Sequence, residues 1–222
     1  MTSYYLHESL SYCLVDGRPI FLDTGNDRYF RLAEDMERAF IAHLDDADIE
    51  PGCMDRLVRR GILTPGRTSR DVPEPIAAPA IESAMEHSIA RTNCGIGTIA
   101  EVFALIIRTR RRLRSRRLQT ILDELCIDRS QSISTDAAER DMQASSHAHA
   151  FLEARRWVPI ETRCLLDSIS LVAFMARRNV DARIVFGVTG DPFSAHCWVQ
   201  RGGLVLNDTI GNTRAYTVIR TV

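Results

Sequence analysis

The sequence predicts an α+β protein with two domains, and three observations carry this prediction. Short strand-like segments followed by helical patterns fill residues 1–63. Four prolines lie within residues 64–79, a composition typical of a linker. Residues 80–222 then run from helical patterns into two strand-like segments. We therefore expect domains at 1–63 and 80–222, joined by a linker at 64–79.

The composition is that of an ordinary globular protein. Of the 222 residues, 45% are hydrophobic and 26% are charged, and the net charge is −1. The six cysteines are scattered without a Cys-x-x-Cys pair, which favours reduced thiols and predicts neither a metal site nor a disulfide framework. The N-terminus lacks a signal-peptide pattern, and the longest apolar stretch, 96–107, is too short to span a bilayer. We expect a cytoplasmic protein without a membrane segment and without a cofactor.

The N-terminal domain is expected to begin with three short strands. They cover residues 11–15, 19–22 and 28–32, and an Asp-Gly hairpin signal separates the first two. Helical patterns follow at 33–44 and from Pro51 to Gly61. Three strands and then helices within about 60 residues predict a winged-helix-like domain.

A winged-helix-like domain is often a DNA-binding module, but the charge argues against that function here. Residues 1–63 hold twelve acidic residues and seven arginines, a net of −5. A surface that binds phosphates should instead be basic. We therefore expect no nucleic-acid partner, and a simple interaction or dimerisation module stays open.

Residues 80–157 are expected to be mainly helical. One apolar stripe contains Ile81, Ala84, Met85 and Ile89, and a second runs from Ile99 to Ile107. The second stripe leads into residues 108–117, where seven of ten residues are arginines. This run is either a solvated helix end, where cations are favourable, or a docking patch for an acidic or phosphate-bearing partner.

Three residues in the last third of the chain have the chemistry of a cysteine nucleophile, its base and the group that orients the base. Cys164 follows helix-start signals at Pro159 and Thr162, so it lies in a first turn, where the helix dipole lowers a thiol pKa. His196 begins a strand-like segment, and Asp208 ends the next one. Each residue alone is commonly structural, but all three in this order favour a catalytic triad.

The pairing of His196 with Asp208 depends on the turn between their strands. A three-residue loop at 201–203 would place Gln200 opposite Leu204 and His196 opposite Asp208, on one side of the sheet. A two-residue loop would shift the register by one and bring Asp208 opposite Cys197. We expect the three-residue loop.

Four motifs carry a resemblance to a known family. They are Cys-Leu-x-x-Ser at 164–168, Arg-Ile-Val-x-Gly-Val at 183–188, Ala-His-x-Trp-Val at 195–199 and Val-Leu-Asn-Asp at 205–208. The pattern resembles the transglutaminase-like cysteine peptidases of lasso-peptide biosynthesis, the B proteins, which remove the leader from a ribosomal precursor peptide. The resemblance implies a papain-like peptidase domain with Cys164 as nucleophile, His196 as base and Asp208 as orienter.

The same resemblance implies a role for the N-terminal domain and a set of partners. Residues 1–63 look like a leader-recognition element, in which the leader adds a strand to the sheet edge at 28–32 and the helix at 53–60 forms the other wall. The partners would be the precursor peptide and a separate asparagine-synthetase-like cyclase. The residues expected to contact the leader are Arg28, Tyr29, Phe30, Leu32, Met54 and Leu57.

Two other functions remain open for the same residues. A true transglutaminase would pass the acyl group to an amine, and its triad would look the same. A non-catalytic scaffold would bind the precursor and present it to another enzyme.

Overall fold

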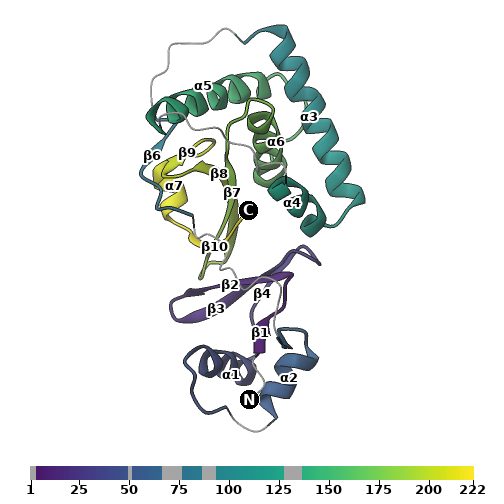
Figure 1. Cartoon of the computed structure of the whole chain (residues 1–222), viewed down its shortest axis with the longest axis vertical. Coiled ribbons are helices and arrows are strands. Elements are labelled where there is room, and N and C mark those ends of the chain that lie inside the picture. The colour runs from purple at the N-terminus through teal and green to yellow at the C-terminus, as the bar shows by residue number, and fades with distance from the viewer. Residues whose placement is uncertain (1–3, 50–51, 67–76, 87–93, 128–136) are drawn as a thin grey trace. The chain divides into compact units, whose positions relative to one another are not determined.

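The chain forms two compact units, Met1–Glu74 and Pro75–Val222. The structure, a computed structural model, describes residues 4–49, 52–66, 77–86, 94–127 and 137–222 (Figure 1). The division between the units falls inside the expected linker 64–79, most of which lies outside the described residues.

The first unit is built on a small antiparallel sheet. Its strands run in the order β2-β3-β4, and β1 pairs separately with β5. A tight turn at Asp16 and Gly17, with φ values of 52° and 75°, joins β2 to β3, as the Asp-Gly signal predicts. The elements are β1 (Tyr4–Leu6), β2 (Leu10–Val15), β3 (Arg18–Asp23), β4 (Arg28–Phe30), α1 (Glu34–Leu44), α2 (Cys53–Arg59) and β5 (Leu63–Pro65).

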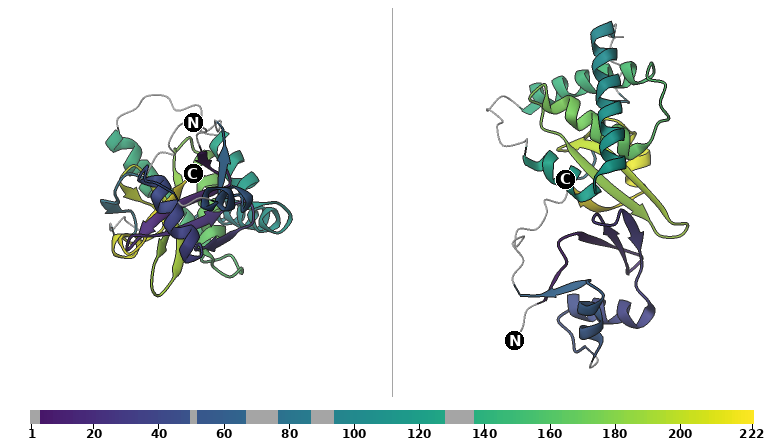
Figure 2. Two further views of the ribbon diagram at one scale, coloured as in Figure 1. Left: turned by 90° about the horizontal axis from the view of Figure 1, so that it is seen from below. Right: turned by 90° about the vertical axis from the view of Figure 1, so that its right-hand side faces the viewer.

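Aromatic rings and α2 form the core of the first unit. Phe21 and Phe40 are fully buried with their ring centroids 4.9 Å apart, and Leu57 of α2 is 0% exposed in the same cluster. The helices α1 and α2 contact each other beside the sheet (Figure 2). The pairing of β1 with β5 was not expected, because each strand has three residues and the partners lie far apart in sequence.

The burial of this core corrects part of the expected leader-binding set. Leu57 is fully buried and Leu32 is 9% exposed, so their side chains pack inside the unit and do not form the wall of a groove. Arg28 is exposed, whereas Tyr29 and Phe30 on β4 and Met54 on α2 are half-buried.

The second unit combines five helices with a five-stranded sheet of order β10-β7-β8-β9-β6 among the described residues. The helix α6 contacts β7 and β8 and also α3 and α5 (Figure 1). The elements are β6 (Glu82–Ser83), α3 (Ile96–Ser115), α4 (Leu118–Ile127), α5 (Ala137–Arg155), α6 (Cys164–Ala176), β7 (Arg183–Thr189), β8 (Ser194–Arg201), β9 (Leu204–Val205), α7 (Ile210–Arg214) and β10 (Thr217–Thr221).

The expected helical stripe that begins at Ile81 is wrong over the part of it that the structure describes. Glu82 and Ser83 form β6, which pairs in parallel with β9, and the Ala84 N–H donates to the Val205 carbonyl at 2.8 Å. Ile81 is 68% exposed and Met85 is 46% exposed, so these apolar side chains do not line a helical core face. Ile89 lies outside the described residues.

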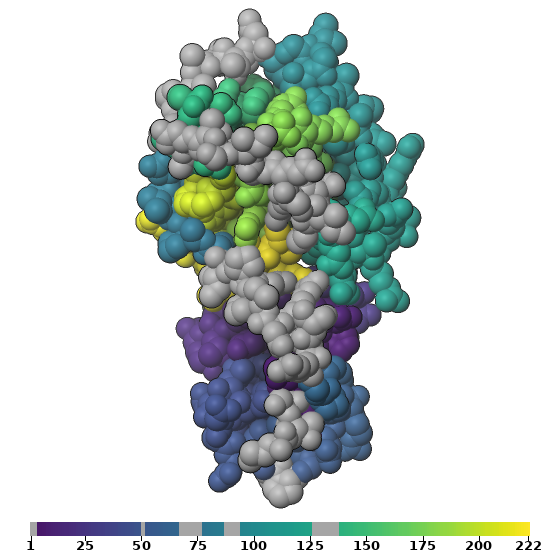
Figure 3. Space-filling model, in the orientation of Figure 1, coloured from purple at the N-terminus to yellow at the C-terminus, as the bar shows by residue number. Residues whose placement is uncertain are grey.

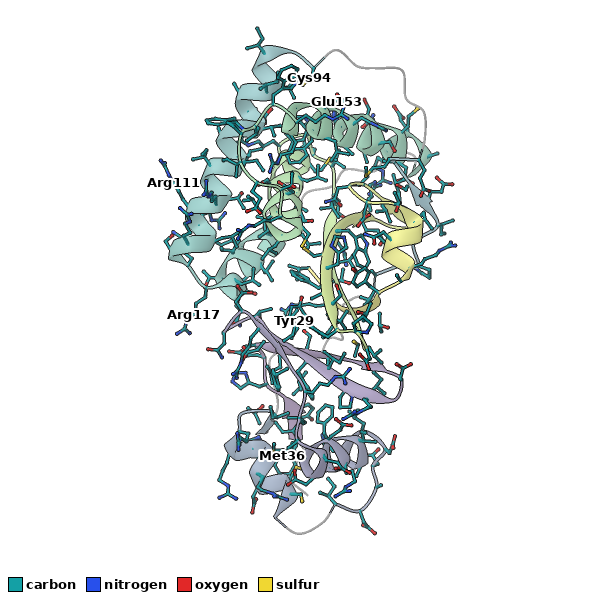
Figure 4. All side chains as sticks on the ribbon, turned by 180° about the vertical axis from the view of Figure 1, so that it is seen from behind. Tyr29, Met36, Cys94, Arg111, Arg117 and Glu153 are labelled. Atoms are coloured by element: carbon teal, nitrogen blue, oxygen red, sulfur yellow. The ribbon has the colours of Figure 1, made fainter. Side chains whose placement is uncertain are left out.

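The arginine run occupies the end of α3 and the turn into α4. Arg112 and Arg116 both form ion pairs with Glu124 of α4. Arg111 and Arg117 point away from the neighbouring helices (Figure 4), and α3 is at the surface of the face drawn in Figure 3. Both interpretations of the run therefore stay open.

The described residues contain neither a membrane-spanning helix nor a cluster of metal-binding side chains. None of the described helices has the length and apolar character needed to cross a membrane. The same residues contain no group of three or more His, Cys, Asp or Glu side chains placed to hold a metal ion.

Candidate active site

Cys164 is the first residue of α6. The preceding residue, Arg163, is extended with φ −141° and ψ 130°, so the helix starts at the cysteine itself. The Cys164 backbone N–H is therefore one of the four donors that a helix start leaves without an intrahelical acceptor. The positive end of the helix dipole and this N–H both face the region around an exposed thiol.

The hairpin between β8 and β9 has a two-residue loop, so the expected three-residue loop is wrong. Gln200 lies opposite Val205 and Arg201 opposite Leu204, with Gly202 and Gly203 as the loop. Gly202 has a φ of 52°, the left-handed conformation that such a turn requires.

Asp208 nevertheless reaches His196, because the chain leaves the ladder shortly after β9. The Leu206 N–H still donates to the Val199 carbonyl at 2.8 Å. The Val199 N–H instead donates to the side-chain oxygen of Asn207 at 2.7 Å, so a side chain replaces the next backbone bond. The turn that follows brings a carboxylate oxygen of Asp208 into a hydrogen bond with His196 Nε2.

The thiol of Cys164 lies beside the part of β8 that does not pair with β9. In the described residues β9 pairs with Gln200 and Arg201, which leaves the first half of β8 without a neighbouring strand on this side. The Cys197 side chain, the His196 ring and the Cys197 backbone N–H are the groups that favour the charged form of the Cys164 thiol. An edge position explains how two successive residues, whose side chains point to opposite faces, both act on one thiol.

These contacts create a thiolate–imidazolium pair. The neighbouring Cys197 and His196 lower the pKa of Cys164 to about 4, and their effect outweighs the partial loss of solvent around the sulfur. The hydrogen bond to Asp208, followed by the contact with Cys164, raises the pKa of His196 to about 10. Between these two values the cysteine is a thiolate and the histidine is protonated.

Asp208 accepts hydrogen bonds from other residues in addition to His196. The Asn212 side-chain amide donates to both of its carboxylate oxygens, at 3.0 and 2.8 Å, and the Thr209 N–H donates at 2.7 Å. Burial acts to raise the pKa of Asp208, but these hydrogen bonds and the one from His196 outweigh it, and the pKa lies below its usual value. The carboxylate is therefore ionised wherever the ion pair exists.

The sequence analysis did not anticipate three polar residues that hydrogen-bond around Cys164, His196 and Asp208: Ser168, Asn207 and Asn212. The side chain of Asn207 also donates to Ser168 Oγ at 3.2 Å, and Ser168 lies one turn after Cys164 on α6, so these two residues join the helix to the sheet. Both residues lie within the sequence motifs around Cys164 and Asp208, whereas nothing in the sequence marked Asn212.

A buried ion pair fixes the chain before α6. Arg155 is 6% exposed and donates to Asp167 Oδ1 at 2.7 Å. It also donates to the carbonyls of Val158, Ile160 and Glu161 at 3.2, 2.9 and 3.2 Å. One guanidinium thereby ties the first turn of α6, which begins at Cys164, to the segment that leads into it.

The His196 ring is packed between aromatic side chains. It lies 6.1 Å from the Trp198 ring and 5.3 Å from the Tyr216 ring, measured between centroids. Gly187 faces His196 on β7, and a Cβ there would lie 2.7 Å from Tyr216 Cβ and 2.9 Å from Trp198 Cζ3. A glycine is needed at this position because Tyr216 Cβ and the Trp198 ring fill its side-chain space.

Gly187→Ala is therefore expected to lower the free energy of unfolding by about 1–3 kcal/mol, the usual range for an overpacked core. Urea unfolding followed by fluorescence would measure the change. Gly211→Ala is the matched control, because a Cβ there meets no atom within 4 Å. Equal stability of the two variants would show that Tyr216 and Trp198 move aside at no cost.

Comparison with known proteins shows to which family this chain belongs. Residues 103–221, more than half of the chain, match the family described as the transglutaminase-like superfamily. The chain belongs to this superfamily. The matched range contains Cys164, His196 and Asp208.

One curated relative is similar over a short stretch. The Microcin J25-processing protein McjB of Escherichia coli is 47% identical over 45 residues, which is 20% of this chain and 22% of McjB. The match therefore spans about a fifth of either protein. No solved structure matches the chain.

Proposed function

We propose that this transglutaminase-like protein is a leader peptidase that matures a lasso precursor peptide. The observation that carries the proposal is the thiolate–imidazolium–carboxylate arrangement at the N-terminus of α6. The partial similarity to McjB, a processing protein by its name, supports a peptide natural product as the substrate class.

In the proposed reaction the Cys164 thiolate attacks the carbonyl carbon of the scissile bond. The Cys164 backbone N–H, left without an acceptor by the helix start, would stabilise the resulting oxyanion. His196 uses Nε2 for Asp208, which leaves Nδ1 to give its proton to the leaving amine as the C–N bond breaks. A water molecule then loses a proton to the imidazole and adds to the thioester, and C–S cleavage releases the leader carboxylate and restores the thiolate.

The first unit is proposed to bind the leader, at the edge of β4. This strand pairs with β3 and ends the three-stranded sheet in the described residues, so a peptide strand would extend the sheet there. Arg28, Tyr29, Phe30 and, from α2, Met54 are the remaining side chains proposed to give specificity.

Tyr29→Ala is expected to weaken leader binding by about tenfold or more, because a half-buried aromatic side chain at a peptide interface commonly contributes that much. Fluorescence anisotropy with a labelled leader peptide would measure the affinity. Leu14→Ala on β2 is the matched control, because that side chain is 48% exposed on the strand at the opposite edge. Equal losses in both variants would contradict the assignment to β4.

A scaffold without catalytic function and a peptidase differ in the reactivity of Cys164. At pH 6 the thiolate should react with iodoacetamide much faster than an ordinary thiol, whose pKa is about 8.5. The rate should fall as the pH drops through the cysteine's pKa of about 4, since protonation removes the nucleophile. Peptide mapping of the alkylated protein checks this profile, and a midpoint near that of an ordinary thiol would favour the scaffold.

The proposed function is tested by incubating the protein with a lasso precursor peptide and following the products by mass spectrometry. A peptidase gives a leader fragment with a free carboxylate. An acyltransferase gives, with an added primary amine, a product that carries the amine in preference to water. If leader binding is tight but no fragment forms, even with the asparagine-synthetase-like cyclase added, the peptidase proposal is wrong.

A further inference from the structure

A segment at the start of the second unit lies beside the strand that leads into Asp208, and the proposed mechanism gives this segment no role. It comprises residues 77–86 and contains β6, which pairs in parallel with β9 at the edge of the sheet. The buried Gln200 side chain on β8 donates to the Ala78 carbonyl at 2.5 Å. Hydrogen bonds to two strands therefore fix the segment to the sheet.

Two side chains of this segment hold the turn formed by residues 208–210. Ser83 is 1% exposed, and its hydroxyl donates to the Asp208 backbone carbonyl at 2.5 Å. The same hydroxyl accepts from the Met85 N–H at 3.1 Å, which orients it. The Glu86 carboxylate accepts from the Ile210 N–H at 3.1 Å. The main chain of the turn is therefore attached to the segment at two points.

The main chain of this turn sets where the Asp208 carboxylate lies. The paired residues of β9 end at Val205, so the ladder with β8 does not extend to Asp208. The Asp208 carbonyl is instead held by Ser83, whose own strand is fixed to the sheet. A support of this kind keeps a functional side chain within the narrow range of positions that its hydrogen bond requires. The direction of the carboxylate toward His196 therefore follows the position of the turn.

We propose that Ser83 and Glu86 are positioning residues for Asp208. Their hydrogen bonds to the turn hold its carboxylate against the His196 ring. Without them the turn can move, and the hydrogen bond between the carboxylate and the ring weakens. A ring that is less readily protonated stabilises the Cys164 thiolate less, so alkylation of the thiol should begin at a higher pH. The inference rests on the proposed nucleophile, but it is the same whichever substrate the protein cleaves.

The test is the pH profile of Cys164 alkylation by iodoacetamide in the full-length protein, followed by peptide mapping. The wild-type midpoint should lie at the pKa of the thiol, about 4. Ser83→Ala should move it upward by about 0.5 unit or more, the order of one weakened hydrogen bond. Ser170→Ala is the matched control, because its hydroxyl is as deeply buried and donates to the Leu166 carbonyl within α6. Its midpoint should stay at the wild-type value.

Ser83→Ala leaves the charges around the site in place. The ionisable groups that act on the thiol and the ring, or lie against them, are Cys197, Asp208, Asp167 with its partner Arg155, and Tyr216. Combining Ser83→Ala with Asp208→Asn separates positioning from a general effect on the fold. If Ser83 acts through the carboxylate, the double variant should have nearly the midpoint of Asp208→Asn alone, whereas additive shifts would contradict the proposal.

Glu86 keeps the proposal testable even if Ser83→Ala does not fold, because this side chain is exposed. Glu86→Gln removes the charge but keeps an oxygen for the Ile210 N–H, whereas Glu86→Ala removes both. The upward shift should therefore be larger in Glu86→Ala.

An unmoved midpoint in folded Ser83→Ala would overturn the proposal. If that variant does not fold, equal midpoints in the two Glu86 variants would overturn it. A wild-type midpoint near that of an ordinary thiol would instead show that the proposed nucleophile is absent, so failure of this inference and failure of the proposed function are distinguishable.

Discussion

Cys164→Ala is expected to reduce cleavage of the precursor by at least about 10⁴-fold, because removing a covalent nucleophile removes the whole acyl-enzyme route. Single-turnover assays with excess protein, followed by mass spectrometry, would measure the remaining rate. Cys94→Ala is the control, since that thiol lies outside the triad and should leave the rate nearly unchanged.

The same variant should keep its affinity for the leader. The residues proposed to bind the leader are in the first unit, whereas Cys164 begins a helix of the second. Unchanged anisotropy of a labelled leader together with lost cleavage separates recognition from chemistry. Cleavage by Cys164→Ala at more than a small fraction of the wild-type rate would exclude this cysteine as the nucleophile.

Asp208→Asn is expected to reduce cleavage by about 10²–10⁴-fold, within the range of lost acid–base catalysis and of a misoriented histidine. The carboxylate is the largest influence that raises the pKa of His196 to about 10, so its loss lowers that pKa. A neutral imidazole stabilises the Cys164 thiolate less, and the pKa of the thiol rises.

The pH profile of Cys164 alkylation tests the role of Asp208 directly. If Asp208 had only a structural role, its replacement would leave this profile unchanged. The midpoint for Cys164 should shift upward from about 4, whereas Asp191→Asn, an exposed carboxylate in the loop before β8, should leave it unchanged. Asn212→Ala should shift the midpoint in the same direction by less, because Asp208 keeps its charge but loses two hydrogen bonds. An unmoved midpoint in Asp208→Asn would remove Asp208 from the triad.

The sequence by itself determined the elements whose patterns are local. The strands β2, β3 and β8 and the helices α1, α3 and α6 lie where alternation, helical spacing and turn signals predict them, because each pattern is complete within one segment. The order of Cys164, His196 and Asp208 along the chain was likewise enough to name the three candidate residues.

Only the tertiary structure decided how those residues meet. A one-residue difference in the β8–β9 loop is invisible to periodicity, and Asp208 reaches His196 because Asn207 ends the ladder and turns the chain. The burial of Leu57 in the core and the strand β6 were equally hidden, since both depend on partners distant in sequence. The lowered pKa of Cys164 is likewise a property of the tertiary structure, because its largest causes, Cys197 and His196, lie on a different element from the cysteine.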